Sequence, residues 1–160
     1  MSSPSEVRFA GPSEFEQVWY LMRMSYGENA VFPLSMRKAA GFVRRALAGQ
    51  EGAIGVIGPE EGELEALAFL SIGTFWYSER PHLEEYMVFV HPDHRKSQHA
   101  KALMRWMKQQ VNETGLPLMT GIFSESARNE AKCRLYQREF PKLGEFFFYK
   151  PNSSTVETSS

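Results

Sequence analysis

The stretch VFVHPDHRKSQHAKALMRWMK, residues 88–108, joins an apolar strand-like run to an amphipathic helical pattern. Basic and polar residues lie where the helix should begin: Arg95, Lys96, Ser97, Gln98 and His99. The first four amides of a helix lack partners inside it, and the peptide dipoles place partial positive charge there. Such an end, flanked by cationic side chains, suits a pyrophosphate. We therefore predict a phosphate site, with solvated loop charges as the alternative interpretation.

The elements that would position this site alternate along the chain. Apolar runs bounded by turn residues predict strands over residues 7–10, 53–57, 64–76, 83–90, 118–123 and 143–149. Helical spacing predicts helices over residues 15–22, 35–47, 100–111 and 127–140. The order is β-α-α-β-β-β-α-β-α-β, a mixed α/β fold around one central sheet. Its strand–helix–strand unit should be parallel.

Composition limits the class of protein. The chain has 160 residues, of which 42% are hydrophobic, and one domain over residues 1–151 with a disordered tail at 152–160 is expected. A net charge of −1 argues against a general nucleic-acid binder. The single cysteine excludes an internal disulfide. With no membrane-spanning run or signal pattern, we expect a cytoplasmic protein.

Two motifs carry a family resemblance. VFVHPDHRKSQHAKAL resembles the acetyl-CoA signature of the GNAT N-acetyltransferase superfamily, an apolar strand followed by Arg/Gln-x-x-Gly-x-Gly/Ala. Arg95 matches its first position and Ala100 its last, whereas Gln98 stands at the usual glycine, which lets the backbone approach phosphate. NEAKCRLYQREF resembles the family's Asn-x-x-x-x-x-Leu-Tyr stretch, with Asn129 and Tyr136 in place. The HPDHR-x-S-x-HA loop is also similar to loops of phage-encoded members.

The resemblance implies an N-acetyltransferase with parallel strands splayed around acetyl-CoA, which donates its acetyl group directly to an amine of a small molecule or protein. Main-chain groups of Val88 and Val90 would pair with the pantetheine arm, and Asn129 would hydrogen-bond it. Tyr136 would protonate the leaving thiolate, and Glu84 aligns with the base of the family's histone acetyltransferases. The amides that would hold the pyrophosphate belong to Arg95, Lys96, Ser97, Gln98, His99, Ala100 and Lys101.

Strand alternation predicts that Glu84 faces the same side as Val88 and Val90. The acceptor should lie against residues 25–34, residues 75–79 and the splayed end of the strand over residues 83–90. Glu28, Glu79 and Glu84 could favour a cationic amine there, although scattered surface acids are an equal interpretation.

Other interpretations stay open at this point. The three histidines His91, His94 and His99 lack an evident cysteine or carboxylate partner, so the sequence predicts no metal site. The aromatic run 146–149 could pair a sheet edge with a second subunit, giving a homodimer. The competing function is a GNAT scaffold that acts by binding a protein, such as a host protein, with weak catalysis or none; Gln98 is the feature that favours it.

Overall fold

The computed structural model describes residues 5–152, so the predicted tail lies outside the described residues except for Asn152. Its elements in chain order are β1 (Arg8–Phe9), the 3-10 turn η1 (Pro12–Glu14), α1 (Phe15–Asn29), α2 (Met36–Leu47), β2 (Gly52–Ile57), β3 (Ala66–Thr74), β4 (Pro81–Val90), the 3-10 turn η2 (Pro92–His94), α3 (His99–Thr114), β5 (Leu118–Met119) and α4 (Asn129–Glu139). No helix among the described residues is long and apolar enough to cross a bilayer.

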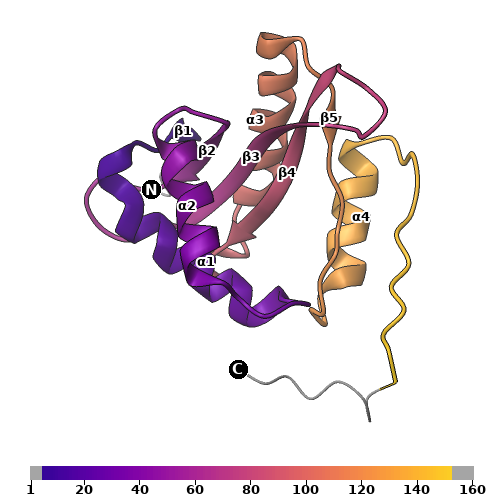
Figure 1. Ribbon diagram of the computed structural model, residues 1–160. Coiled ribbons are helices and arrows are strands. Elements are labelled where there is room, and N and C mark those ends of the chain that lie inside the picture. Colours follow the sequence, from indigo (N-terminus) through magenta and orange to yellow (C-terminus); the bar gives the residue numbers. More distant parts are fainter. Residues whose placement is uncertain (1–4, 153–160) are drawn as a thin grey trace.

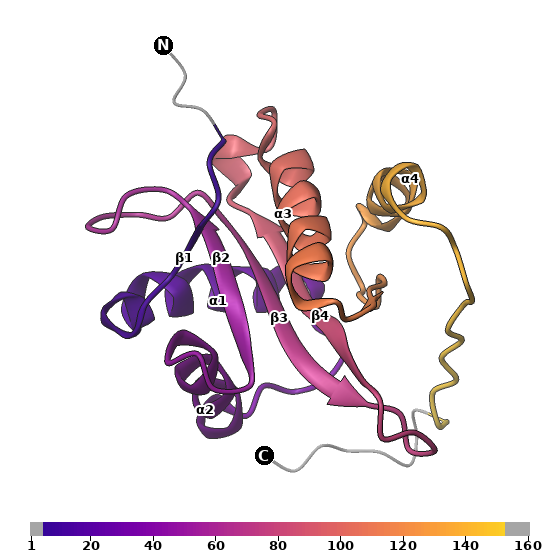
Figure 2. The ribbon, with the colours of Figure 1, turned by 90° about the horizontal axis from the view of Figure 1, so that it is seen from above.

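One five-stranded sheet organises the molecule, with the strands in the order β1-β2-β3-β4-β5. The first four strands are antiparallel, and β4 and β5 are parallel, as the strand–helix–strand pattern predicted. Helices α1 and α2 cover one face of the sheet, and α3 and α4 lie on the other (Figures 1 and 2). The predicted mixed α/β fold is confirmed.

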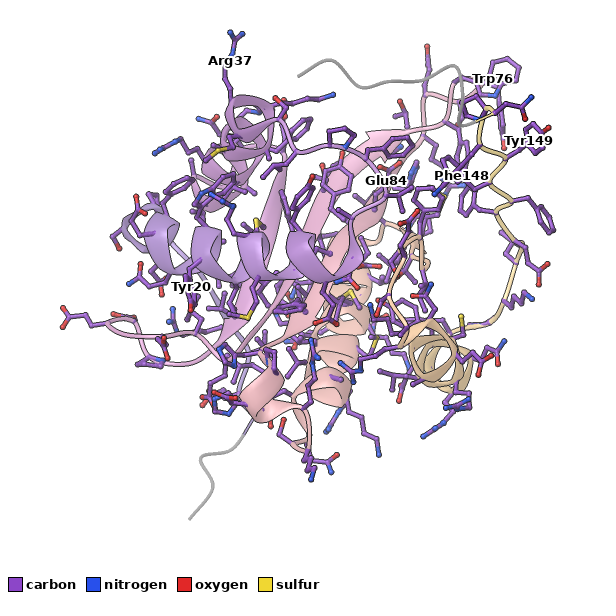
Figure 3. All side chains as sticks on the ribbon, turned by 90° about the horizontal axis from the view of Figure 1, so that it is seen from below. Tyr20, Arg37, Trp76, Glu84, Phe148 and Tyr149 are labelled. Atoms are coloured by element: carbon purple, nitrogen blue, oxygen red, sulfur yellow. The ribbon has the colours of Figure 1, made fainter. Side chains whose placement is uncertain are left out.

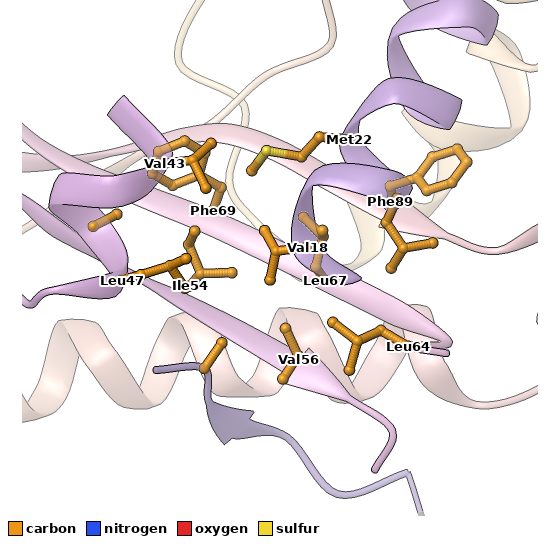
Figure 4. Packing of buried hydrophobic residues seen from close by; sticks show 13 residues of the cluster. Val18, Met22, Val43, Leu47, Ile54, Val56, Leu64, Leu67, Phe69 and Phe89 are labelled. Atoms are coloured by element: carbon orange, nitrogen blue, oxygen red, sulfur yellow. The ribbon is translucent and has the colours of Figure 1, made fainter. Parts of the chain in front are cut away.

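Each face of the sheet has its own apolar core. Under α1 and α2, Val18 and Val43 pack with Ile54, Leu67 and Phe69 of the strands (Figure 4). On the opposite face, α3 packs through buried residues that include Leu103, Met104 and Met107. Burying a side chain of this size stabilises the fold by about 1.5–3 kcal/mol. The two cores therefore hold helices against both faces of the sheet.

Strands β4 and β5 separate soon after they meet. Only Leu83 and Glu84 of β4 pair with β5, at Leu118 and Met119. The rest of β4, through Val90, has no partner strand on that edge among the described residues. The predicted splay is therefore present, although β5 is shorter than the predicted strand 118–123.

A β-bulge interrupts β4 just after the residues that pair with β5. In the register with β3, Phe69 pairs with Met87 and Leu70 pairs with Glu85, so Tyr86 is the extra residue. An inserted residue reverses which side chains share a face. After the bulge Met87 and Phe89 face α1 and α2, whereas Val88 and Val90 face α3.

The prediction of a final strand over residues 143–149 is wrong. After Glu139 the described residues contain no helix or strand, and the aromatic side chains lie in solvent, with Phe147 89% and Tyr149 91% exposed (Figure 3). Phe148 makes edge contacts to the rings of Phe32 and Phe123. An aromatic run has high strand propensity, but it forms a strand only when a neighbouring strand pairs with it.

Candidate active site

A cleft of about 680 Å³ opens where β4 and β5 separate. Its walls come from α1, the α1–α2 connection, α2, β3, β4, the segment after β5 and α4. Most lining side chains are apolar or aromatic, including Trp19, Met22, Phe42, Phe69 and Phe123. The charged groups on its wall are Arg23, Lys38, Glu85 and Lys132. A concave apolar cleft with a few polar groups is the usual form of a small-molecule site.

Glu85 is the acidic group of the cleft. Its Oε2 accepts hydrogen bonds from Thr120 Oγ1 at 2.7 Å and from Tyr136 Oη at 3.3 Å. Burial raises the pKa of Glu85 to about 7, against the hydrogen bonds and nearby Lys132, which lower it. A carboxyl with this pKa exchanges protons near neutral pH, as a general base must.

Tyr136 lies beside Glu85, where α4 faces the open part of β4. Burial first, and then the charge of Glu85, raise the pKa of Tyr136 well above its ordinary value. The phenol therefore keeps its proton at neutral pH and can donate it. The cleft thus contains a proton acceptor, Glu85, and a proton donor, Tyr136, that are hydrogen-bonded to each other.

The expectation that Glu84 shares a face with Val88 and Val90 is wrong. Because of the bulge, that face belongs to Glu85, and Glu84 points to the opposite side. Its carboxylate contacts His82 Nε2 at 2.8 Å, and Glu84 does not line the cleft. Simple alternation could not identify Glu85, because a bulge leaves no clear mark in the sequence.

The open edge of β4 presents main-chain groups toward the gap. The amide of His91 donates to Glu65 O at 2.8 Å, so in this antiparallel pair every second residue bonds β3. By the same alternation, Val88 and Val90 direct their amide and carbonyl groups to the other edge. The Val90 carbonyl already accepts from Arg95 Nε at 3.2 Å. Val88 therefore has the freer main-chain groups of the two.

Arg95 points into the protein. Its guanidinium pairs with Glu28 of α1 at 2.5 Å and lies over the Phe89 ring. The side chain thus ties the loop after β4 to α1.

The start of α3 has several free donors. The main-chain amides of four residues donate no hydrogen bond within the described part of the chain: Lys96, Gln98, Ala100 and Lys101. By contrast, the His99 amide donates to Ser97 Oγ, whose hydroxyl donates to His94 O. The Ser97 hydroxyl therefore braces the loop internally and is not a free donor.

Gln98 does not distort this turn. Its φ is −92°, which any residue adopts, so glycine is not needed there for backbone geometry. Its side chain is exposed and lies outside the cleft. Asn129, the other polar candidate, begins α4 and bonds Ser124 through both its amide nitrogen and its carbonyl oxygen.

A second cluster lies at the far end of the same loop. Glu65, just before β3, brings Oε1 to 2.8 Å from His94 Nδ1 and 3.3 Å from His99 Nε2. The expectation that these histidines lack a carboxylate is wrong, because β3 pairs with β4 and carries Glu65 across. Only knowledge of the strand register could have placed it there.

Comparison with known proteins completes the description of the site. The sequence profile of the Acetyltransferase (GNAT) family matches residues 17–140, a range that includes both predicted motifs. No curated protein sequence matches the chain.

Solved structures share the fold. An aminoglycoside acetyltransferase, meta-AAC0020, from an uncultured soil metagenomic sample in complex with trehalose is 14% identical over 92% of this chain and 96% of that chain, with a TM-score of 0.66. AAC(6')-Iy in complex with the bisubstrate analogue CoA-S-monomethyl-acetylneamine is 17% identical over 92% and 97%, with a TM-score of 0.66. Integron cassette protein HFX_CASS3 from the mobile metagenome of Cole Harbour Salt Marsh is 22% identical over 94% and 93%, with a TM-score of 0.66.

Proposed function

Because the chain belongs to the acetyltransferase (GNAT) family, we propose that it transfers an acetyl group from acetyl-CoA directly to an amine. The observation that carries the proposal is the Tyr136–Glu85 hydrogen bond inside a cleft beside the open edge of β4. A donor and an acceptor of protons lie together where a thioester and an amine could meet.

The residues present fit acetyl-CoA as substrate. The free amides of Lys96, Gln98, Ala100 and Lys101 suit a pyrophosphate at a helix start. The unpaired edge of β4 suits the amide-bearing pantetheine arm, which can bond Val88 as an added strand would.

Acetyl transfer requires two proton movements. An ordinary alkylamine, with a pKa near 10.4, must lose a proton, which costs about 4–5 kcal/mol at pH 7. Glu85 in its ionised form accepts that proton, directly or through one water molecule. The new C–N bond forms as the C–S bond breaks, and Tyr136 gives its proton to the departing sulfur. The products are the acetylated amine and CoA, and the two side chains recover their protonation through solvent.

The cleft favours an acceptor that differs from an aminoglycoside. Aminoglycosides are polycations, whereas the cleft wall presents Arg23, Lys38 and Lys132 against one carboxylate, Glu85. Among the described residues, Arg23 and Lys38 have no side-chain partner, so both can bind an anion. The expected cationic amine also loses support, because Glu28 is paired with Arg95 and Glu84 lies outside the cleft. We propose a primary amine with an aromatic or aliphatic body and a carboxylate or similar anionic group.

A screen for CoA release tests this function. Purified protein with acetyl-CoA is offered matched amines: an aromatic amino acid, its decarboxylated amine and an aminoglycoside. Faster turnover of the amino acid supports the proposal, whereas turnover of the aminoglycoside alone refutes the acceptor class. No turnover of any amine, together with no acetyl-CoA binding, would favour the scaffold function. The observation that favours the scaffold function is the exposed aromatic run 146–149, a surface that a partner protein could cover.

A further inference from the structure

We propose that Glu65, His94 and His99 form a binding site for a divalent transition-metal ion, with Zn²⁺ as its natural occupant. The three ligand atoms, Glu65 Oε1, His94 Nδ1 and His99 Nε2, all lie within 4.8 Å of one another. They are separate from the cleft that holds Glu85 and Tyr136. The site goes beyond the proposed acetyl transfer and does not depend on it.

The distances match a shared ion. Zn²⁺ binds imidazole nitrogen at about 2.0–2.1 Å and carboxylate oxygen at about 2.0–2.2 Å, so neighbouring ligand atoms of a tetrahedral site lie about 3.3 Å apart. The separations here are 2.8 Å from Glu65 Oε1 to His94 and 3.3 Å to His99. The third separation, from His94 Nδ1 to His99 Nε2, is no more than 4.8 Å, so the three ligand atoms are near enough to share one ion once the side chains adjust around it.

The ligands are held by the backbone before any ion binds. Glu65 is fixed on both sides, since its amide donates to Ile57 O and its carbonyl accepts from His91. His94 ends η2 and His99 begins α3, and the Ser97 hydroxyl bridges the two, bonding His94 O and the His99 amide. A preorganised set of this kind loses little entropy on binding.

The second ring nitrogen of His99 is also occupied. Its Nδ1 lies 2.7 Å from Ser5 Oγ, which fixes the ring orientation and leaves Nε2 to face Glu65. Metal-bound histidines usually have such an outer partner. His99 itself is buried, so its ring is not an ordinary solvated surface histidine.

The donor set identifies the class of ion. Two imidazoles and one carboxylate are typical ligands of Zn²⁺, whereas Mg²⁺ and Ca²⁺ prefer oxygen ligands alone. His94 is partly exposed, so a water molecule can complete the coordination sphere. Because His94 directly precedes Arg95, a bound ion would also add positive charge to the loop that leads to the start of α3.

The test measures metal binding by tag-free protein, independently of activity. The protein is stripped with a chelator and titrated with Zn²⁺ by calorimetry, and then with Co²⁺, whose visible spectrum reports tetrahedral coordination. We expect one equivalent to bind, a rise in Tm on binding, and at least a ten-fold loss of affinity in Glu65→Gln and His94→Ala. His91→Ala is the matched control, because its ring lies 5.8 Å from that of His94 without belonging to the ligand set, and it should bind as the wild type does.

Two results would overturn the site. One is no Zn²⁺ bound at micromolar free metal by the folded wild-type protein, which would leave a network of hydrogen bonds among the three side chains. The other is equal loss of affinity in His91→Ala and in the ligand variants, which would indicate adventitious surface binding. Glu65→Gln keeps the side-chain shape, so circular dichroism can confirm that a lost affinity reflects lost coordination in a folded protein.

Discussion

Tyr136 Oη donates a hydrogen bond to Glu85 Oε2 at 3.3 Å, and this contact joins α4 to β4 across the cleft. The two groups come from sequence positions 51 residues apart, and both pKa values are raised mainly by burial. Glu85 thereby reaches the neutral range, and Tyr136 is held in its protonated form. Environments that assign opposite proton roles to neighbouring groups are typical of acid–base catalysis.

Replacing Glu85 with glutamine should lower kcat/KM about 100-fold, because the amide cannot accept the amine proton. In the wild type kcat/KM should rise with pH through about 7, since Glu85 is ionised only above its pKa. In Glu85→Gln the inflection near pH 7 should be absent, and only the gradual increase from the free amine should remain. A pH profile of initial rates checks both. The matched control is Glu84→Gln, whose side chain contacts His82 outside the cleft and which should keep near wild-type rates; a larger loss at Glu84 than at Glu85 would reverse the assignment.

The same substitution should stabilise the protein at alkaline pH. Folding raises the pKa of Glu85 from 4.5 to about 7, so its favourable contribution is complete below pH 4.5 and is lost as pH rises through 7. Glutamine has no charge to bury. Urea unfolding should find Glu85→Gln and the wild type similar near pH 4.5, with the variant about 2 kcal/mol more stable at pH 8, after allowance for partial solvent screening. Equal stability of the two proteins at pH 8 would show that the carboxylate is not destabilised by burial.

Tyr136→Phe removes the proton donor and keeps the ring against Phe140. We expect kcat to fall at least ten-fold, while the Kd for acetyl-CoA changes less than three-fold, because the hydroxyl bonds Glu85 and serves the leaving group but is not assigned to holding the bound cofactor. Stopped-time assays combined with calorimetry separate the two quantities. A variant with unchanged kcat would show that solvent protonates the thiolate and that Tyr136 is structural.

Arg95→Ala should weaken acetyl-CoA binding even though the side chain points inward. It removes the bonds to Val90 O and Glu28 and leaves the half-buried Glu28 carboxylate without its partner. Loss of one member of such a pair costs about 3 kcal/mol or more when fully buried, and less at this partial exposure. We expect a lower Tm and a Kd raised about ten-fold. Arg105→Ala, which removes an exposed arginine of α3, is the control and should change neither value.

Charge reversal at the cleft wall tests the acceptor class. In Arg23→Glu and Lys38→Glu, turnover of an aromatic amino acid should fall at least ten-fold relative to its decarboxylated amine, because the anion loses its cation. Rising salt should reduce the wild-type preference in the same direction. If the preference is the same in the variants as in the wild type, neither cation contacts the acceptor.

Much of the fold follows from local pattern. The apolar stripe of α3 and the left-handed Gly115 at its end fix that helix, and Ser35 caps α2 by accepting from Lys38. The site is less accessible from sequence, because the bulge at Tyr86 exchanges the faces of Glu84 and Glu85. Cross-strand register likewise brings Glu65 to His94, and no local spacing could predict it. The run 143–149 misled the strand prediction because propensity does not supply a pairing partner.

The most direct test is calorimetric titration of acetyl-CoA into the wild-type protein, with Gln98→Gly in parallel. Binding at micromolar concentration, preserved or tightened in Gln98→Gly, is the result we predict, since the free amides at the start of α3 are independent of the glutamine side chain. Absence of binding at millimolar acetyl-CoA in a folded protein would contradict the proposed acetyl transfer.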